Sequence, residues 1–244
     1  MWSEDNSQEF IDYGRYFVPA RETQIAIISR LIPETDEPFH VLELCCGEGL
    51  LAEAILARHP SCTVHGYDGS PAMLRRATAR LARFGQRFQA QQFDLADAGW
   101  RRQLDPVRAV VSSLCIHHLD GRQKAALYDD LAQLLAPGGV LIIADLIKPA
   151  TATAQALAAE EWDEMVRRQA LEQDNDETAF GQFQKMKWNI FRYPDPFDKP
   201  SPIYDQLLWL KSAGFETVDV YWMAAGHAIY GGWLAPIEGQ SDPG

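Results

Sequence analysis

The chain has 244 residues, of which 47% are hydrophobic, and its formal net charge is -12. This length supports one hydrophobic core with a small cap, and the acidic balance argues against a nucleic-acid-binding protein, which needs a basic face to neutralise phosphates. No segment reaches the roughly 18 apolar residues of a membrane helix. The first residues lack the basic start of a leader peptide, so we expect a cytoplasmic protein.

The N-terminal 38 residues precede the first expected strand, and we interpret residues 1–38 as a cap segment followed by a helix. Residues 1–9 are polar, and we expect them to be loose. An aromatic-rich stretch follows, which includes Tyr13 and Tyr16. Apolar residues at helical spacing then predict a helix over about 25–31.

A buried strand over about 39–44 runs into a glycine turn, with the sequence Glu43-Leu44-Cys45-Cys46-Gly47-Glu48-Gly49. Glycine lets a backbone approach a ligand closely. The next predicted strand ends in a second acid, Asp68, at about the 20-residue offset that brings a strand-end carboxylate to a nucleotide ribose. The turn and the two acids predict a site for an adenosine-containing cofactor.

Strands and helices alternate through the region 39–148, which we interpret as the cofactor-binding core. Ser70 and Pro71 start a helix that we expect to end at Gly85, and Asp120 with Gln123 fits a capping box. Further strands are predicted over about 88–93, 109–114 and 140–145. Such alternation is typical of a parallel sheet with helices on both faces, whose ligand lies at the carboxyl ends of the strands.

The region 149–198 breaks this alternation, because it is polar, acidic and helical with scattered aromatic residues. We interpret it as a helical cap or lid inserted after the fifth strand. A helix and two strands over 199–236 are expected to complete the core, and the tail 237–244 is expected to be disordered.

Four cysteines are present, and none forms a Cys-x-x-Cys pair. We expect all of them to be reduced and mostly buried, as in a cytosolic protein. They are Cys45, Cys46, Cys62 and Cys115. Metal-ligand spacing of cysteine and histidine is absent, so no metal site is predicted.

The glycine turn resembles motif I of the class I S-adenosylmethionine-dependent methyltransferases, usually written acid-x-Gly-x-Gly-x-Gly. Glu43, Gly47 and Gly49 match it, while Cys45 replaces the first glycine, so we expect Cys45 to hold an ordinary negative φ. Other segments of the core resemble the same family. They are Phe93-Asp94-Leu95, the run from Ser112 to Leu119, the run from Leu134 to Leu141, and the run from Ser212 to Glu216.

The resemblance implies an α/β fold, with a Rossmann-like doubly wound sheet of seven strands, mostly parallel, with an antiparallel C-terminal edge hairpin and a helical cap. It implies S-adenosyl-L-methionine as cofactor and S-adenosyl-L-homocysteine as product. By position, Glu43 would fix the cofactor's amino group, Asp68 its ribose hydroxyls and Asp94 its adenine amino group. Further contacts would come from Leu44, Cys45, Gly47, Gly69, Met73, Leu95 and Ser113. A helix-capping role for Asp94 and a core role for Met73 stay open.

His117 follows the fourth strand, where O-methyltransferases of the resembled family often place a general base, and imidazole titrates near neutrality. Our hypothesis is that His117 is that base; the alternative is that it and His118 pack against or cap the next helix. Aromatic and polar residues outside the core are expected to line a substrate pocket. They are Tyr13, Tyr16, Trp188, Arg192, Tyr193, Trp222 and His227. Arg21 or Arg192 is a candidate to hold a carboxylate.

The leading functional prediction is a methyltransferase that acts on a small molecule by in-line displacement. Alternatives are an RNA-modifying enzyme of the same fold, an enzyme that uses a modified cofactor, and a non-catalytic cofactor-binding module. A nicotinamide-dependent oxidoreductase is disfavoured, because Cys45 and Leu50 stand where that fingerprint has glycine. The sequence identifies neither the methyl acceptor and its attacked atom nor the oligomeric state.

Overall fold

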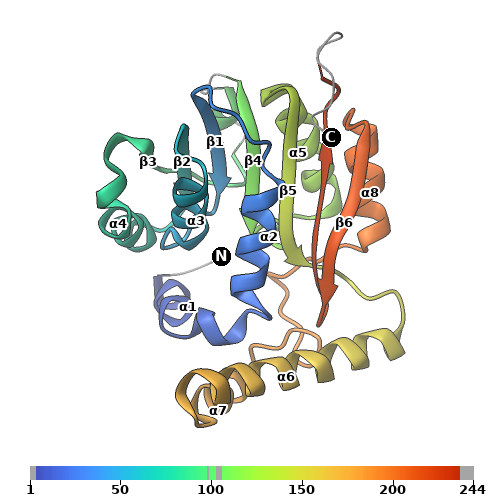
Figure 1. Ribbon diagram of the computed structural model, residues 1–244. Helices are drawn as coiled ribbons and strands as arrows, with labels where there is room; N and C mark the ends of the chain where they lie inside the picture. Colours follow the sequence, from blue (N-terminus) through green and yellow to red (C-terminus); the bar gives the residue numbers. More distant parts are fainter. Residues whose placement is uncertain (1–3, 98, 103–105, 237–244) are drawn as a thin grey trace.

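The computed structural model describes residues 4–97, 99–102 and 106–236, and it is built around one sheet (Figure 1). The sheet has seven strands in the order β3-β2-β1-β4-β5-β7-β6. Their bounds are β1 Phe39–Leu44, β2 Cys62–Asp68, β3 Phe88–Gln92, β4 Val107–Ser113, β5 Leu135–Leu146, β6 Thr217–Ala224 and β7 His227–Trp233. The first five strands are parallel, and β7 pairs antiparallel with both β5 and β6. The predicted fold class is confirmed.

Eight α-helices within the described residues surround the sheet. Their bounds are α1 Glu4–Phe17, α2 Arg21–Leu31, α3 Leu50–Arg58, α4 Pro71–Arg80, α5 Gly121–Leu134, α6 Ala152–Asp174, α7 Thr178–Lys185 and α8 Ile203–Ser212. Side chains of β5 alternate between the two faces, as a strand's period of two requires. Leu141 and Ile143 join the core under α5 and α8, whereas Ile142 and Ala144 join the core under α2 and α3.

The predicted capping residues begin two of these helices. The Ser70 hydroxyl accepts a hydrogen bond from the Met73 amide at 3.2 Å, and Asp120 and Gln123 form the reciprocal capping box. The expected end of α4 at Gly85 is wrong. The helix ends at Arg80, and a 3-10 segment, Ala82–Arg87, follows before β3.

A third core cluster joins α1, α6 and α7 beyond the carboxyl ends of the parallel strands, at the bottom of Figure 1. Trp162 of α6 donates its indole N–H to the Phe17 carbonyl at 2.7 Å. Residues 4–9, expected to be loose, are helical because α1 packs against α6 and α7. The predicted disordered tail, 237–244, lies outside the described residues.

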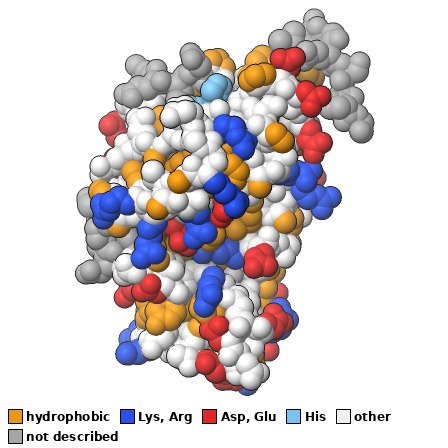
Figure 2. All heavy atoms as spheres, turned by 60° about the vertical axis from the view of Figure 1, so that its left-hand side comes forward, with side chains coloured by type: hydrophobic (Ala, Val, Ile, Leu, Met, Phe, Trp, Pro, Cys, Tyr) orange, Lys and Arg blue, Asp and Glu red, His pale blue; other side chains and the backbone are white. Residues whose placement is uncertain are grey.

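The side of the molecule that carries α3 and α4 comes forward in Figure 2, where Lys and Arg side chains are interspersed with Asp and Glu. Arg80 forms ion pairs with Glu48 and Glu53 at 3.0 and 3.3 Å. These positive charges are therefore partly compensated by neighbouring acids. Within the described residues, no helix is both long enough and apolar enough to cross a bilayer.

Candidate functional site

The turn after β1 contains three left-handed residues in alternation, with φ of 56° at Cys45, 54° at Gly47 and 83° at Gly49. The expected negative φ of Cys45 is therefore wrong. Past that residue, the Cys46 amide still donates to the Tyr67 carbonyl at 3.0 Å, so pairing with β2 continues beyond the bend. A non-glycine residue in this conformation costs about 1–2 kcal/mol. Cys45 thus adopts the backbone shape that glycine gives the motif.

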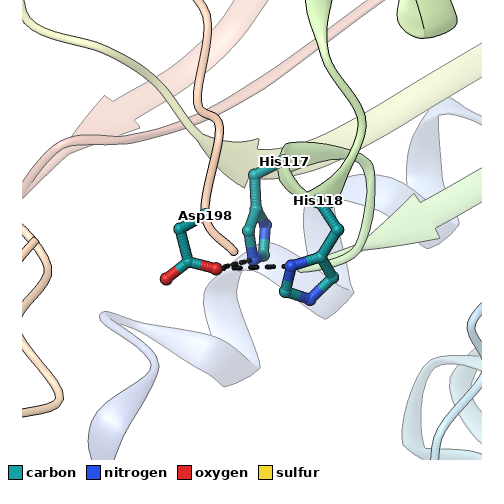
Figure 3. Close-up of side chains that lie close together, drawn as sticks. All are labelled: His117, His118 and Asp198. Atoms are coloured by element: carbon teal, nitrogen blue, oxygen red, sulfur yellow. Dashed lines mark ion pairs between the residues drawn. The ribbon is translucent and has the colours of Figure 1, made fainter. Parts of the chain in front are cut away.

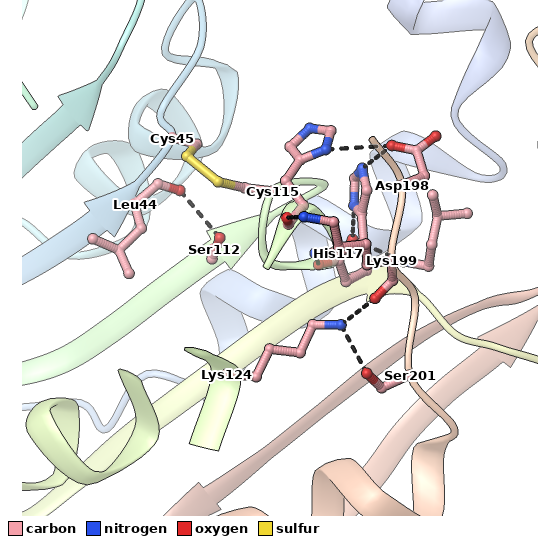
Figure 4. A network of polar contacts seen from close by, with 12 residues as sticks. Leu44, Cys45, Ser112, Cys115, His117, Lys124, Asp198, Lys199 and Ser201 are labelled. Atoms are coloured by element: carbon pink, nitrogen blue, oxygen red, sulfur yellow. Dashed lines mark hydrogen bonds and ion pairs between the residues drawn. A yellow bond between two sulfur atoms is a disulfide. The ribbon is translucent and has the colours of Figure 1, made fainter. Parts of the chain in front are cut away.

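Cys45 and Cys115 form a disulfide, with 6.1 Å between their Cα atoms (Figure 4). The expectation that all four cysteines are reduced is wrong for this pair; Cys46 and Cys62 are free and buried. The two bonded residues are 70 positions apart in the sequence, but they follow the paired strands β1 and β4. The bond joins the glycine turn to the segment after β4, where Leu114 also has a positive φ of 54°.

Glu43 lies at the end of β1 and is only 2% exposed. Its Oε2 is one of the few buried polar side-chain atoms of the described residues that has no hydrogen-bond partner. Burial, reinforced by the nearby charge of Asp68, raises the pKa of Glu43 to about 8. A buried carboxylate oxygen of this kind requires a donor, and a cationic ligand group would supply one.

Asp68, at the end of β2, shapes the turn that faces Glu43. Its two carboxylate oxygens accept hydrogen bonds from the backbone amides of Gly47 and Ser70, both at 2.8 Å. A Cβ built on Gly47 would meet nothing within 4 Å, so the turn leaves open space beside it. A buried carboxylate oxygen without a partner and an open glycine turn fit S-adenosylmethionine, which carries an ammonium group and no phosphate.

The other predicted cofactor residues gather at the same edge of the sheet. Leu44 and Ser113 end the neighbouring strands β1 and β4, and Gly69 follows β2. Met73 is buried in α4, and Leu95 packs against the main core. Asp94 is exposed and accepts a hydrogen bond from the Ala96 amide at 2.9 Å, so it makes a local turn of its own.

Arg21, the first residue of α2, lies over the ring of Phe10, with its guanidinium carbon 4.9 Å from the ring centroid. Burial lowers the pKa of Arg21 to about 10, against the attraction of Glu48 and Glu43. Arg21 is therefore a cation close to the Glu43 carboxylate, which has one oxygen without a hydrogen-bond partner.

His117 lies in the 3-10 segment Ile116–His118 and is buried against Asp145 of β5. Its Nδ1 is 2.5 Å from Asp145 Oδ1, and its backbone amide donates to Asp145 Oδ2 at 2.8 Å. Asp145 also accepts the Leu146 amide at 2.8 Å. The carboxylate thus fixes both the main chain and the ring of His117.

Asp198, in the segment between the cap and α8, faces the other side of the imidazole (Figure 3). Its Oδ1 lies 3.4 Å from His117 Nε2 and 3.3 Å from His118 Nδ1. Burial alone would lower the pKa of His117, but Asp145 and Asp198 outweigh it and raise that pKa to about 9. The pKa of Asp145 is lowered in turn, since the charge and hydrogen bond of His117, the Leu146 amide and the charge of Lys124 together outweigh the effect of burial.

A buried lysine holds the segment that carries Asp198 (Figure 4). Lys124 of α5 donates from Nζ to the Lys199 carbonyl at 2.5 Å and to the Ser201 hydroxyl at 2.9 Å. The Lys199 amide donates to the His117 carbonyl at 2.7 Å. These hydrogen bonds fix the residues that directly follow Asp198, and they hold Asp198 opposite the two histidines.

A cavity of about 440 Å³ lies between the carboxyl edge of the sheet and the cap. Of the residues predicted to surround a substrate, the structure brings His117, Trp188, Tyr193 and His227 to its wall. Sequence reasoning missed other lining residues. They include Phe10, Phe17, Leu114, Trp162 and Asp198.

Four other predicted pocket residues lie outside the wall of this cavity. Tyr13 stacks on Phe17, with ring centroids 5.3 Å apart, and the Tyr16 hydroxyl donates a hydrogen bond to Asp174. Arg192 donates to Asp163 at 2.6 Å beside a separate depression, and Trp222 packs against the core under α2 and α3.

His227 completes the polar part of the cavity wall. Its Nδ1 lies 2.8 Å from the Ala225 carbonyl, and its ring meets Trp162 edge to face at 4.6 Å. Burial lowers the pKa of His227 to about 4, so this ring is neutral at physiological pH. With Nδ1 donating to the carbonyl, Nε2 is left as an acceptor.

Comparison with known proteins gives a family for the core. Residues 41–139 match a family model described as a methyltransferase domain. A trans-aconitate 2-methyltransferase from Methylobacterium radiotolerans is 37% identical over 132 residues, which are 51% of this chain and 45% of that relative. This chain thus spans less than half the length of that curated relative.

Solved structures share the fold. An O-methyltransferase family protein from Burkholderia thailandensis aligns with a TM-score of 0.65 and 20% identity, over 89% of this chain and 57% of that one. A mycolic acid cyclopropane synthase, solved in complex with SAH and CTAB, aligns with a TM-score of 0.55 and 16% identity, over 82% and 63%. Residues 41–139 therefore carry a methyltransferase domain of the class I S-adenosylmethionine-dependent type, and the whole seven-stranded sheet has the fold of these solved structures.

Proposed function

We propose that this protein transfers the methyl group of S-adenosylmethionine to a small molecule that binds in the cavity under the cap. When bound, the cofactor supplies a methyl carbon activated by the adjacent sulfonium. The observation that carries the proposal is the shared segment after β4. Cys115 is bonded to Cys45 of the glycine turn, while Leu114 and His117 line the cavity, so one short loop adjoins both the turn and the cavity.

The chain's own residues account for the cofactor's main polar groups. Glu43 has a buried oxygen without a partner, which suits the ammonium of the methionine part. Asp68 is fixed by two backbone amides, and carboxylate oxygens can accept further hydrogen bonds from ribose hydroxyls. Arg21 is the candidate partner for the methionine carboxylate, because it is a partly buried cation near Glu43.

The cavity wall favours a compact acceptor that has both an apolar part and polar groups. Phe10, Phe17, Trp162 and Trp188 supply aromatic surface. Polar groups come from the histidines and from Lys187, Asp195 and Asp198. Sites of this composition orient a ligand with a few polar atoms and bury the rest. Arg192, a candidate for holding an acceptor carboxylate, is already paired with Asp163.

Within this proposal His117 is the candidate general base. Its Nδ1 is held by Asp145, and its Nε2 lies on the side of Asp198 and the cavity. His117 Nε2 can take a proton from the methyl acceptor only when this nitrogen carries no proton itself. Closeness and alignment of the two substrates in the enclosed cavity would supply much of the rate enhancement.

Calorimetric titration of the purified protein with S-adenosylhomocysteine, with NAD as the control ligand, tests the proposal first. We expect saturable binding of S-adenosylhomocysteine alone. Asp68→Ala should abolish it, and Asp219→Ala, a change of an exposed acid on β6, should leave it intact. Binding of NAD alone would overturn the proposal. An acceptor screen then follows, in which normal turnover by His117→Ala would exclude this residue as the base.

A further inference from the structure

His117, His118 and Asp198 bring three metal-ligating atoms together on the cavity wall (Figure 3). The atoms are the imidazole Nε2 of His117, the imidazole Nδ1 of His118 and a carboxylate oxygen of Asp198. All three lie within 4.8 Å of one another. No metal was predicted from the sequence, because Asp198 comes from a segment far along the chain from the two histidines.

The distances suit a small metal ion placed between the three atoms. Ligands of a tetrahedral zinc ion, with bonds of about 2.0–2.1 Å, are about 3.3–3.4 Å apart. The carboxylate oxygen of Asp198 is 3.4 Å from one imidazole nitrogen and 3.3 Å from the other. Two edges of the coordination polyhedron therefore have the required length.

The surroundings of the cluster also match a metal centre. A histidine ligand usually donates its second ring N–H to a carboxylate, which fixes the ring and its tautomer. Asp145 does this for His117, at 2.5 Å from Nδ1. Lys124 and the Lys199 amide fix the segment of Asp198, so the third ligand is preorganised as well.

The facing atoms call for a cation between them. Asp198 Oδ1 is an acceptor, and His117 Nε2 is also an acceptor when its ring is neutral. Either a proton on the ring or a metal ion can separate them. Without a metal, both imidazoles can donate hydrogen bonds to Asp198, and a metal ion coordinated by His117, His118 and Asp198 would replace these hydrogen bonds.

We propose that His117, His118 and Asp198 bind a divalent first-row transition metal, with at least one coordination position open toward the cavity. Two imidazoles and one carboxylate suit zinc or iron rather than magnesium or calcium, which prefer oxygen ligands. With the metal bound, His117 Nε2 is a ligand rather than the general base, and the open position would take an oxygen atom of the acceptor and polarise it. This second role rests on the proposed function, whereas metal binding itself does not.

Metal titration of the chelator-treated protein tests the site directly, with Zn²⁺ by calorimetry and Co²⁺ by visible absorption. The ring nitrogens of His40 and His65 are 2.9 Å apart on β1 and β2, and this second pair could bind metal by itself. All measurements should therefore be made in a His65→Ala background. We expect saturation at a single equivalent, with Co²⁺ absorption bands that indicate nitrogen and oxygen ligands.

His118→Ala is the decisive variant, because this partly exposed residue is the ligand least involved in packing. We expect it to weaken Zn²⁺ binding by more than about 100-fold. Asp198→Ala should do the same, and unchanged circular dichroism would show that both variants fold. Absence of saturable binding, or binding that survives both substitutions, would overturn the proposal. Failure to bind S-adenosylhomocysteine would overturn the proposed function and leave this result unaffected.

Discussion

Two acids end strands of the same sheet, and their surroundings are opposite. Asp145 of β5 is bonded to the ring and amide of His117 and to the Leu146 amide, and its pKa is lowered. Glu43 of β1 has an oxygen without a partner, and burial raises its pKa to about 8. The comparison shows that an acid at a strand end can have all its hydrogen bonds made within the protein, or can keep an oxygen that is available to a ligand.

The largest expected effect follows from removing the satisfied acid. Asp145→Ala should destabilise the protein by about 3–5 kcal/mol, because it leaves the buried, charged ring of His117 without its main partner. Urea unfolding at neutral pH measures this. Asp219→Ala, in an exposed acid, should change stability by less than about 0.5 kcal/mol. A loss of the same small size at Asp145 would break the contrast between the two strand ends.

The unsatisfied acid should behave in the opposite way. Glu43→Gln should stabilise the cofactor-free protein by about 2–4 kcal/mol at pH 8, because it removes a charge that the folded state disfavours. The same variant should bind S-adenosylhomocysteine about 10–100-fold more weakly, having lost a charge-assisted hydrogen bond. Thermal unfolding and calorimetry give the two values.

The pH dependence of stability distinguishes Glu43 further. Its folded pKa of about 8 exceeds the ordinary value of 4.5, so the folded state holds a proton that the unfolded state releases. This contribution to stability is full below pH 4.5 and is lost as pH rises through 8. The melting temperature of the wild type, compared with that of Glu43→Gln at the same pH, should therefore fall as the pH rises from 4.5 to 8. A constant difference would show that Glu43 titrates normally.

Lys124 holds the segment that carries Asp198, and its removal should lower the stability of the protein by less than the removal of Asp145. Lys124→Met should destabilise the protein by about 1–3 kcal/mol, because the Lys199 carbonyl and the Ser201 hydroxyl lose their buried donor. Urea unfolding gives the loss of stability. Lys211→Met, in an exposed lysine of α8, is the matched control and should be close to neutral. Equal stabilities of the two variants would mean that the contacts of Lys124 contribute little.

The smallest expected change in stability comes from a substitution in the glycine turn beside Glu43. In reducing buffer, Cys45→Gly should stabilise the protein by about 0.5–1 kcal/mol, since glycine adopts a positive φ without the steric penalty. The adjacent Cys46 is buried and has no positive φ, so Cys46→Gly should destabilise. Thermal unfolding of the two variants, compared side by side, checks the sign. Destabilisation by Cys45→Gly would mean that the side chain contributes more than the backbone conformation costs.

Local sequence signals predicted the sheet well. Strand and helix alternation, the capping residues Ser70 and Asp120, and the acids at Glu43 and Asp68 all depend on contacts close in the chain or on strand order. A parallel sheet brings its strand ends to one edge, so the cofactor side could be assembled from the sequence.

The acceptor side depends on packing between distant segments, and there the sequence was less informative. Asp198 meets His117 only because Lys124 and the Lys199 amide dock its segment, and no spacing rule encodes that. Trp222 shares the aromatic character of Trp188, but its position on β6 directs it to the core under α2 and α3. Asp145, at the end of the fifth predicted strand, carried the same signal as Glu43 and could have been chosen.

Two indoles in the cavity wall have an optical consequence. Trp162 is held by its hydrogen bond to Phe17 and touches the His227 ring, and Trp188 lies on the same wall. Indole emission changes in intensity and wavelength when water is displaced or a flat molecule stacks nearby. The protein therefore contains an intrinsic fluorophore pair on the wall of the cavity proposed to bind the acceptor, and candidate molecules can be ranked by fluorescence before any turnover is observed.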